Sequence, residues 1–94
     1  MNKQNAIKAI EKTIQKSFES FSKDTEWQPI VSTRAQLNYI LDALLGKNDA
    51  SRLEEITIGI LAVREFETNE EDFANLIYEV VEIVDLIKKG KFNL

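Results

Sequence analysis

The side chains that could do chemistry in this 94-residue sequence are its carboxylates, because the chain contains neither His nor Cys. Without these residues there is no thiolate nucleophile, no imidazole base, and no nitrogen or sulfur ligand for zinc. Glu79, Glu82 and Asp85 lie three residues apart, so a helix would carry them on one side. Such carboxylates can hold Mg²⁺ when acids on a second helix face them. The chemistry left to consider is therefore a magnesium site between two helices.

The second half of such a magnesium site is missing from the sequence. The preceding predicted helix has acids only near its ends, at Glu54, Glu55 and Glu65, and none between residues 56 and 64. We therefore interpret the acids of the last helix as a solvated face, with a Mg²⁺-dependent all-α nucleotide pyrophosphohydrolase as the alternative. No Ser has a recognisable base, and the glycines are too far apart for a phosphate-binding loop. We expect no catalytic residue, no metal and no cofactor, and we predict that the protein is not an enzyme.

Other residues could contact a partner protein, and each also has a structural interpretation. The acidic run Glu70–Asp72 could engage Lys or Arg on a partner, or could stabilise the positive N-terminal end of a helix. Trp27 and Tyr39 could anchor an interface, because aromatic residues are enriched in binding hot spots. Trp27 is also typical of a residue that plugs the core under a loop. Arg64 and Glu65 could form a recognition corner at a helix end or a local ion pair.

Hydrophobic periodicity predicts four helices joined by short connections. The first runs from Asn5 to about Ser22, and a connector containing the only Pro follows. Ser32 or Thr33 would cap the second helix, and Gly46 suits the left-handed residue that often follows a helix end. The expected core positions of these two helices are Ala6, Ile7, Ile10, Ile14, Phe18, Phe21, Leu37, Ile40, Leu41, Leu44 and Leu45.

The third helix is predicted from the capping-box spacing of Ser51 and Glu54. A strand at Ile56–Val63 is the competing interpretation, because this stretch is rich in β-branched residues and includes a glycine. The helix is favoured by the spacing of its apolar residues, and Gly59 would permit close helix packing. Its expected core face is Leu53, Ile56, Ile60 and Val63, widened by Ile58 and Leu61.

The last helix follows a polar linker at Glu65–Asn69. Thr68 or Asn69 would cap it, and Gly90 would end it before a short tail, Lys91–Leu94. Its expected core face is Phe73, Leu76, Ile77, Val80, Ile83, Val84 and Ile87.

Four amphipathic helices with short connections predict an all-α fold, a small antiparallel four-helix bundle that forms one domain over residues 1–94. The absence of Cys excludes disulfides, and we recognise neither a secretory signal nor a membrane span. The net charge is −4, and no basic stripe is present. This composition argues against a nucleic-acid partner and suits a basic protein partner.

The stretch from Gln36 to Glu67 resembles a known family. It contains Gln36-Leu37-Asn38-Tyr39-Ile40, then Arg52-Leu53, then Ile56-Thr57-Ile58-Gly59 running into Ala62-Val63-Arg64-Glu65-Phe66-Glu67. In order and spacing these pieces resemble small immunity proteins of type VI secretion, which protect bacteria against an NAD(P)⁺-glycohydrolase effector toxin. The likeness covers nearly the whole chain, although the first and last helices match in pattern more than in residue identity.

The resemblance implies an all-helical fold, a cognate effector toxin domain as partner, occlusion of the toxin active site, and residence in the cytoplasm. Toxins paired with this family can differ in chemistry and include nucleotide pyrophosphokinases. We expect no nucleic-acid or membrane partner, and a homodimer of the unbound chain stays open. A structural or regulatory helical adaptor is the main alternative. An acidic inhibitor could place carboxylates where the toxin binds phosphate groups, so the predicted partner contacts are Tyr39, Arg64, Glu65, Glu67, Glu70, Glu71 and Asp72.

Overall fold

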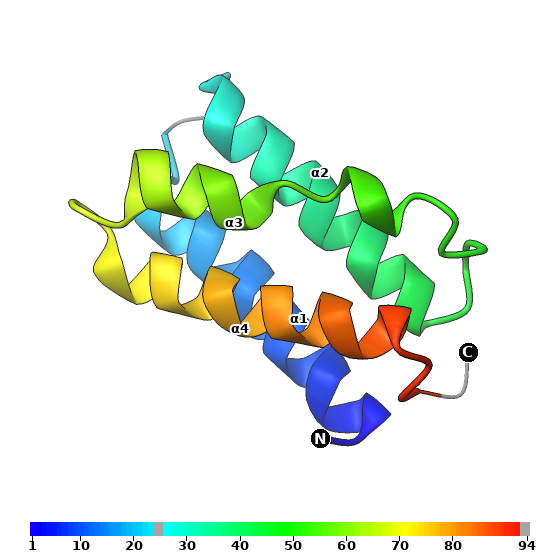
Figure 1. Ribbon diagram of the computed structural model, residues 1–94. Coiled ribbons are helices and arrows are strands. Elements are labelled where there is room, and N and C mark those ends of the chain that lie inside the picture. The colour runs from blue at the N-terminus through cyan, green and yellow to red at the C-terminus, as the bar shows by residue number, and fades with distance from the viewer. Residues whose placement is uncertain (24–25, 93–94) are drawn as a thin grey trace.

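Helices make up the regular secondary structure of the computed structural model, which describes residues 1–23 and 26–92. Within these residues there is no strand, so the all-α prediction is confirmed and the alternative strand at Ile56–Val63 is wrong. Part of the predicted connector (Asp24, Thr25) and of the predicted tail (Asn93, Leu94) lies outside the described residues. The elements in chain order are α1 (Lys3–Ser20), α2 (Gln28–Leu44), the 3₁₀ turn η1 (Leu53–Glu55), α3 (Ile58–Leu61), the π-helical segment η2 (Ala62–Phe66) and α4 (Glu71–Lys88) (Figure 1).

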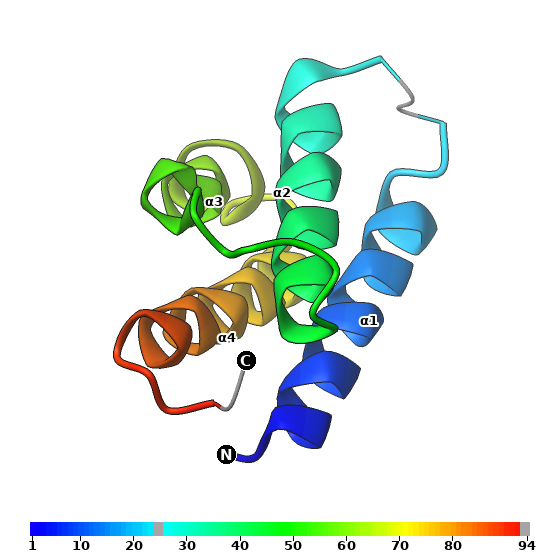
Figure 2. The same cartoon turned by 90° about the vertical axis from the view of Figure 1, so that its right-hand side faces the viewer.

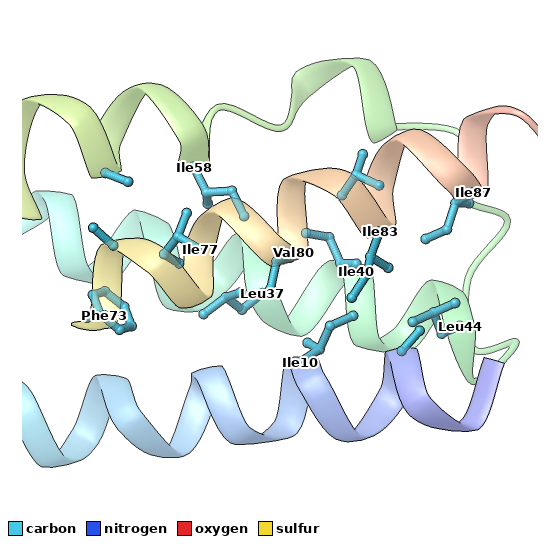
Figure 3. Close-up of a cluster of buried hydrophobic side chains, with 14 of the residues drawn as sticks. Ile10, Leu37, Ile40, Leu44, Ile58, Phe73, Ile77, Val80, Ile83 and Ile87 are labelled. Atoms are coloured by element: carbon cyan, nitrogen blue, oxygen red, sulfur yellow. The ribbon is translucent and has the colours of Figure 1, made fainter. Parts of the chain in front are cut away.

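The helices form a small bundle, as predicted. α1 packs against α2 and α4, and α3 packs against the same two helices, so the elements enclose a shared interior. Figure 2 shows α1 and α2 side by side, with α3 and α4 as a second pair on one flank. In Figure 3 the inward side of α4 lies between Ile58 of α3 and residues of α1 and α2, including Ile10 and Leu37.

The start of each of the first two helices has a local cause. In α1, the Asn2 side chain accepts a hydrogen bond from the Asn5 N–H at 2.8 Å and caps the helix. α2 starts at Gln28, several residues before the predicted caps, with Pro29 in its first turn. Proline fits there because the first turn needs no N–H donor. The predicted capping role of Ser32 or Thr33 is therefore wrong, and the Thr33 hydroxyl instead donates to the Pro29 carbonyl at 2.7 Å.

The predicted third helix is broken in the structure. Ser51 does not begin a helix, and its N–H donates to the Asp49 side chain at 3.0 Å. Ile56 has an extended backbone between η1 and α3, with φ −71° and ψ 124°. This break changes the helical phase, so the apolar face that starts at Leu53 does not continue. Ile60 and Val63 are consequently exposed, contrary to the prediction, and the buried side chains are Ile58, Ala62 and Phe66.

Most of the predicted core of the last helix is confirmed. Thr68 and Asn69 do not cap α4, which begins at Glu71 without a side-chain capping bond. Gly46 and Gly90 have φ values of +74° and +70°, which confirms both as left-handed residues after a helix. Phe92, expected in a tail, is buried. The buried side chains of α4 are Phe73, Ala74, Ile77, Val80, Ile83, Val84 and Ile87.

Gly59 allows α3 to approach α4 closely, as the sequence predicted. A Cβ atom at this position would lie 3.2 Å from Val81 Cγ2, which is tighter than normal contact. The part of the chain that the structure describes contains no helix with both the length and the apolar character needed to cross a bilayer.

Candidate functional site

The predicted partner contacts fall into two groups. Tyr39 lies in α2, close to the chain that enters η1. The other predicted residues lie in η2, in the turn after it and at the start of α4. In Figure 1 this turn and the connection after α2 lie at opposite ends of the molecule. The members of the second group, here called the acidic turn, are Arg64, Glu65, Glu67, Glu70, Glu71 and Asp72.

The acidic turn is held by the backbone and presents its charges to solvent. The Glu67 N–H donates to the Ala62 carbonyl at 2.8 Å, and the Glu70 N–H donates to the Phe66 carbonyl at 2.7 Å. Arg64, Glu67, Glu71 and Asp72 are exposed, whereas Glu65 and Glu70 are half-buried. Among the described residues no ion pair joins Arg64 to Glu65, whereas Arg52 pairs with Glu55 and Lys88 pairs with Glu54.

Phe66, beneath the acidic turn, belongs to an aromatic cluster that fixes the turn in place. Its ring centroid lies 5.3 Å from that of Phe21 and 5.0 Å from that of Phe73. Trp27 lies 5.8 Å from Phe21 and 5.9 Å from Phe66, and 38% of its surface stays exposed. Trp27 therefore covers the edge of the core, which agrees with its interpretation as a plug under a loop.

Tyr39 has a structural role that its sequence position did not reveal. Its hydroxyl accepts a hydrogen bond from the Arg52 N–H at 2.8 Å, and its carbonyl accepts one from Asn48 Nδ2 at 3.1 Å. These bonds tie the connection after α2 to the helix. The half-buried Tyr39 ring also lines an open groove of about 290 Å³ together with Arg52, Glu55 and Ile56.

Gln36 joins α2 to the start of α3. The Thr57 N–H donates to Gln36 Oε1 at 2.6 Å, while Gln36 Nε2 donates to the hydroxyls of Ser32 and Thr57 at 3.0 Å each. Because a backbone N–H can only donate, the atom that meets it must be the amide oxygen, which fixes the orientation of the Gln36 side chain. Gln36 was part of the resemblance, but nothing in the sequence had given it a role.

The pKa values of several side chains near these regions are shifted, and that of Arg52 is raised by its hydrogen bond to Glu55. Hydrogen bonding to Arg52 lowers the pKa of Glu55, and hydrogen bonding to Ser51 lowers the pKa of Asp49. Burial raises the pKa of Tyr78 on α4, and the nearby Glu67 carboxylate adds to the effect. The Tyr78 hydroxyl is buried and has no hydrogen-bond partner among the described residues. None of these groups has the base, nucleophile and orienting partner that a catalytic set requires.

The carboxylates considered for magnesium lie on the surface of α4. Glu79, Glu82 and Asp85 are all exposed. Within residues 1–23 and 26–92, no three acidic side chains come close enough to hold a metal ion.

An exposed apolar pair lies on α3 and η2, where the sequence pattern predicts buried residues. Ile60 is 60% exposed and Val63 is 57% exposed, although both had been assigned to the core. A groove of about 200 Å³ between α3 and α4 adjoins Ile60. The sequence feature that could have predicted this exposure is the β-branched pair Ile56-Thr57 before Gly59, because these residues favour a break in the helix.

Comparison with known proteins gives two findings. A model of the Tsi6 family matches residues 4–85 of the sequence. A chain in the solved structure of Tse6 in complex with Tsi6 is similar in fold, with a TM-score of 0.83 and 22% sequence identity over 90% of this chain and 92% of that chain. No curated protein matches the sequence.

Proposed function

The chain belongs to the Tsi6 family, and from this premise we propose that it is an immunity protein that binds a cognate effector toxin domain. The family is the one that the Gln36–Glu67 stretch resembled, and it is a family of immunity proteins rather than enzymes. The observation that carries the proposal is the match over residues 4–85. This range includes nearly all of α1, the elements from α2 to η2, and most of α4. The shared fold with a chain from the Tse6–Tsi6 complex supports it.

The physical properties of the chain suit an inhibitor that acts by docking. A stable interface of standard size needs about 800 Å² from each partner, and the whole chain exposes 5825 Å². Binding then depends on a few buried anchors and on charge complementarity. We propose that the bound chain covers the toxin active site and excludes its substrate.

The partner chemistry that we propose is an NAD(P)⁺ glycohydrolase, encountered in the cytoplasm. Such an enzyme must bind the phosphate groups of its substrate, so its active site is expected to present basic side chains. The exposed carboxylates of the acidic turn have the complementary charge, and we propose them, together with Arg64, as contacts at the rim of the interface. Tyr39 is proposed as a separate aromatic contact, although its hydroxyl is already engaged by Arg52.

The test is to produce the product of the gene beside that of this chain, as the candidate toxin, and to measure its NAD⁺ consumption while this chain is added. We expect inhibition that is complete at equimolar amounts, and a complex that co-elutes in gel filtration. A catalytically inactivated toxin variant serves as the control for binding, because it can be produced without harming the cells and should still co-elute with this chain. Unchanged NAD⁺ consumption, with no complex at micromolar concentrations, would contradict the proposal.

A further inference from the structure

An apolar ridge stands on the outer side of α3 and η2. Ile60 and Val63 are more than half exposed and lie three residues apart, so both project from the same side of the helical segment. The opposite side is filled by Ile58, Ala62 and Phe66, none of which reaches solvent. Core packing therefore does not account for the two exposed side chains, here called the Ile60–Val63 ridge.

The groove between α3 and α4 adjoins this ridge. Ile60 is one of its walls, and Gly59 contributes backbone without a side chain. Its volume is about 200 Å³, and cavities of about 150 Å³ are large enough to bind benzene. The groove can thus receive one apolar side chain from a partner. Four of its eight lining residues are aliphatic and two are charged, and the full lining is Ile56, Thr57, Gly59, Ile60, Val81, Val84, Asp85 and Lys88.

The charges near the ridge favour a toxin domain over a second copy of this chain as the partner that binds there. The segment that carries the ridge, residues 52–72, contains seven acidic residues and two arginines, and the groove beside it adds Asp85 and Lys88. A second copy of this chain, docked by two-fold symmetry, would bring the same acidic segment against itself, and like charges across an interface are unfavourable. A toxin domain with basic side chains around an apolar protrusion would be complementary to both the charge and the groove.

We propose that the Ile60–Val63 ridge and the adjoining groove form the apolar centre of the effector-docking surface. One apolar side chain of the toxin domain enters the groove, and basic toxin residues face the surrounding acids. This inference rests on the proposed function and adds the surface that performs it. The arrangement follows the usual anatomy of an interface, in which an apolar centre provides most of the affinity and a charged rim guides association.

The binding test uses alanine variants and the toxin domain encoded beside this chain. The double variant Ile60→Ala and Val63→Ala removes the ridge, and alanine preserves helix formation. The matched control is Leu45→Ala, which truncates an aliphatic side chain that is 45% exposed just after α2. We expect the double variant to weaken toxin binding by about 30-fold or more, and the control to remain within about threefold of the unsubstituted chain.

A second measurement reports on the surface directly and does not depend on a change in affinity. Because the chain contains no Cys, Ile60→Cys and Leu45→Cys each introduce a single thiol. In the proposed complex the thiol at position 60 is covered and reacts much more slowly with an alkylating reagent, whereas the thiol at position 45 reacts at the same rate with and without toxin. Circular dichroism confirms that each variant is folded.

The possible outcomes separate the two proposals. If the unsubstituted chain neither binds nor inhibits the toxin, the proposed function fails, and this inference fails with it. If the unsubstituted chain inhibits the toxin but the double variant binds within threefold and position 60 stays reactive, the function stands and the docking surface lies elsewhere. A dimer that the double variant dissociates, with toxin affinity unchanged, would also overturn the inference and would assign the ridge to self-association.

Discussion

At the scale of single residues, polar side chains within the Gln36–Glu67 stretch hold the backbone of this chain. Gln36 binds the start of α3, and Tyr39 binds the connection that leads to η1. Gly59 permits the close approach of α3 to Val81. These contacts explain why the Gln36–Glu67 stretch resembles a family, because several of its residues are required by the fold. The residues that meet the toxin need not be the same ones.

Two substitutions of Gln36 should show whether its hydrogen bonds or its packing contribute to the free energy of unfolding. Gln36→Leu leaves the Thr57 N–H without its partner, and we expect a loss of about 0.5–1.5 kcal/mol in the free energy of unfolding. Gln36→Glu keeps an acceptor for that N–H, and the two hydroxyls can donate to its carboxylate, so we expect a value within about 0.5 kcal/mol of the parent. Urea unfolding at pH 7 measures both. Equal losses in the two variants would show that the hydrogen bonds do not matter.

Tyr78 should make stability depend on alkaline pH. Its pKa is raised in the folded chain, so above pH 10 the unfolded state loses the proton first and stability falls. Tyr78→Phe removes the hydroxyl that lacks a hydrogen-bond partner, and we expect this variant to be at least as stable at pH 7. Its advantage should grow between pH 9 and 11. Urea unfolding across this range is the measurement, and an advantage that does not change with pH would contradict the assignment.

At the scale of elements, the break between η1 and α3 decides which side chains face the core. Leu53 is buried before the break and Ile58 after it, but the spacing between them does not follow one helix.

The C-terminal end of α1 depends on a residue of another helix, because no basic residue lies in the last turn of α1 itself. Arg34 of α2 supplies that charge, with Nη2 donating to the Ser17 and Phe21 carbonyls at 2.9 and 3.1 Å.

Removal of Arg34 should therefore loosen the end of α1. Its guanidinium also lies 4.2 Å from the centre of the Phe18 ring and donates to the Ser17 hydroxyl. We expect Arg34→Ala to lower the free energy of unfolding by about 1–3 kcal/mol. Arg34→Lys should recover only part of this, because an ammonium lacks the planar fork of donors. Thermal unfolding followed by circular dichroism tests the order, with exposed Arg64→Ala as a control expected within about 0.5 kcal/mol of the parent.

At the scale of the whole molecule, an aromatic cluster connects the end of α1 with η2 and α4. Phe21 contacts both Phe66 and Phe73, with ring centroids 5.3 and 5.5 Å apart. This cluster holds the acidic turn at one end of the bundle, so its exposed carboxylates form a fixed patch. A fixed patch of one sign can accelerate the approach of an oppositely charged partner.

Charge reversal within the acidic turn should slow toxin association. For Glu67→Lys with Glu71→Lys, we expect an association rate about tenfold lower at low salt and a weaker dependence of that rate on salt. The dissociation rate should change less, because rim charges act mainly on encounter. The control is Glu11→Lys with Glu19→Lys on α1, which makes the same change in net charge. Surface plasmon resonance at several salt concentrations measures the rates, and equal effects of both pairs would remove the acidic turn from the interface.

The proposed binding surface could be predicted from the sequence only in part. The acids from Glu65 to Asp72 are recognisable because a polar run between two helices is expected to be exposed. Ile60 and Val63 were assigned to the core, because periodicity reports that residues share a face and does not report which way the face points. That direction depends on where the chain breaks before α3, and the break is stabilised by Gln36, which is 21 residues away from Thr57.

The sequence by itself determined the helical class, most of the core of α4, the ends of α2 and α4 at Gly46 and Gly90, and the family. These features depend on local spacing and on residue type, which a single chain displays directly. Only the tertiary structure decided which face of the α3–η2 segment is buried, what Gln36, Tyr39 and Arg34 bind, and where an apolar ridge stays open to a partner. These features depend on contacts between residues distant in sequence, and such contacts are formed only when the helices pack.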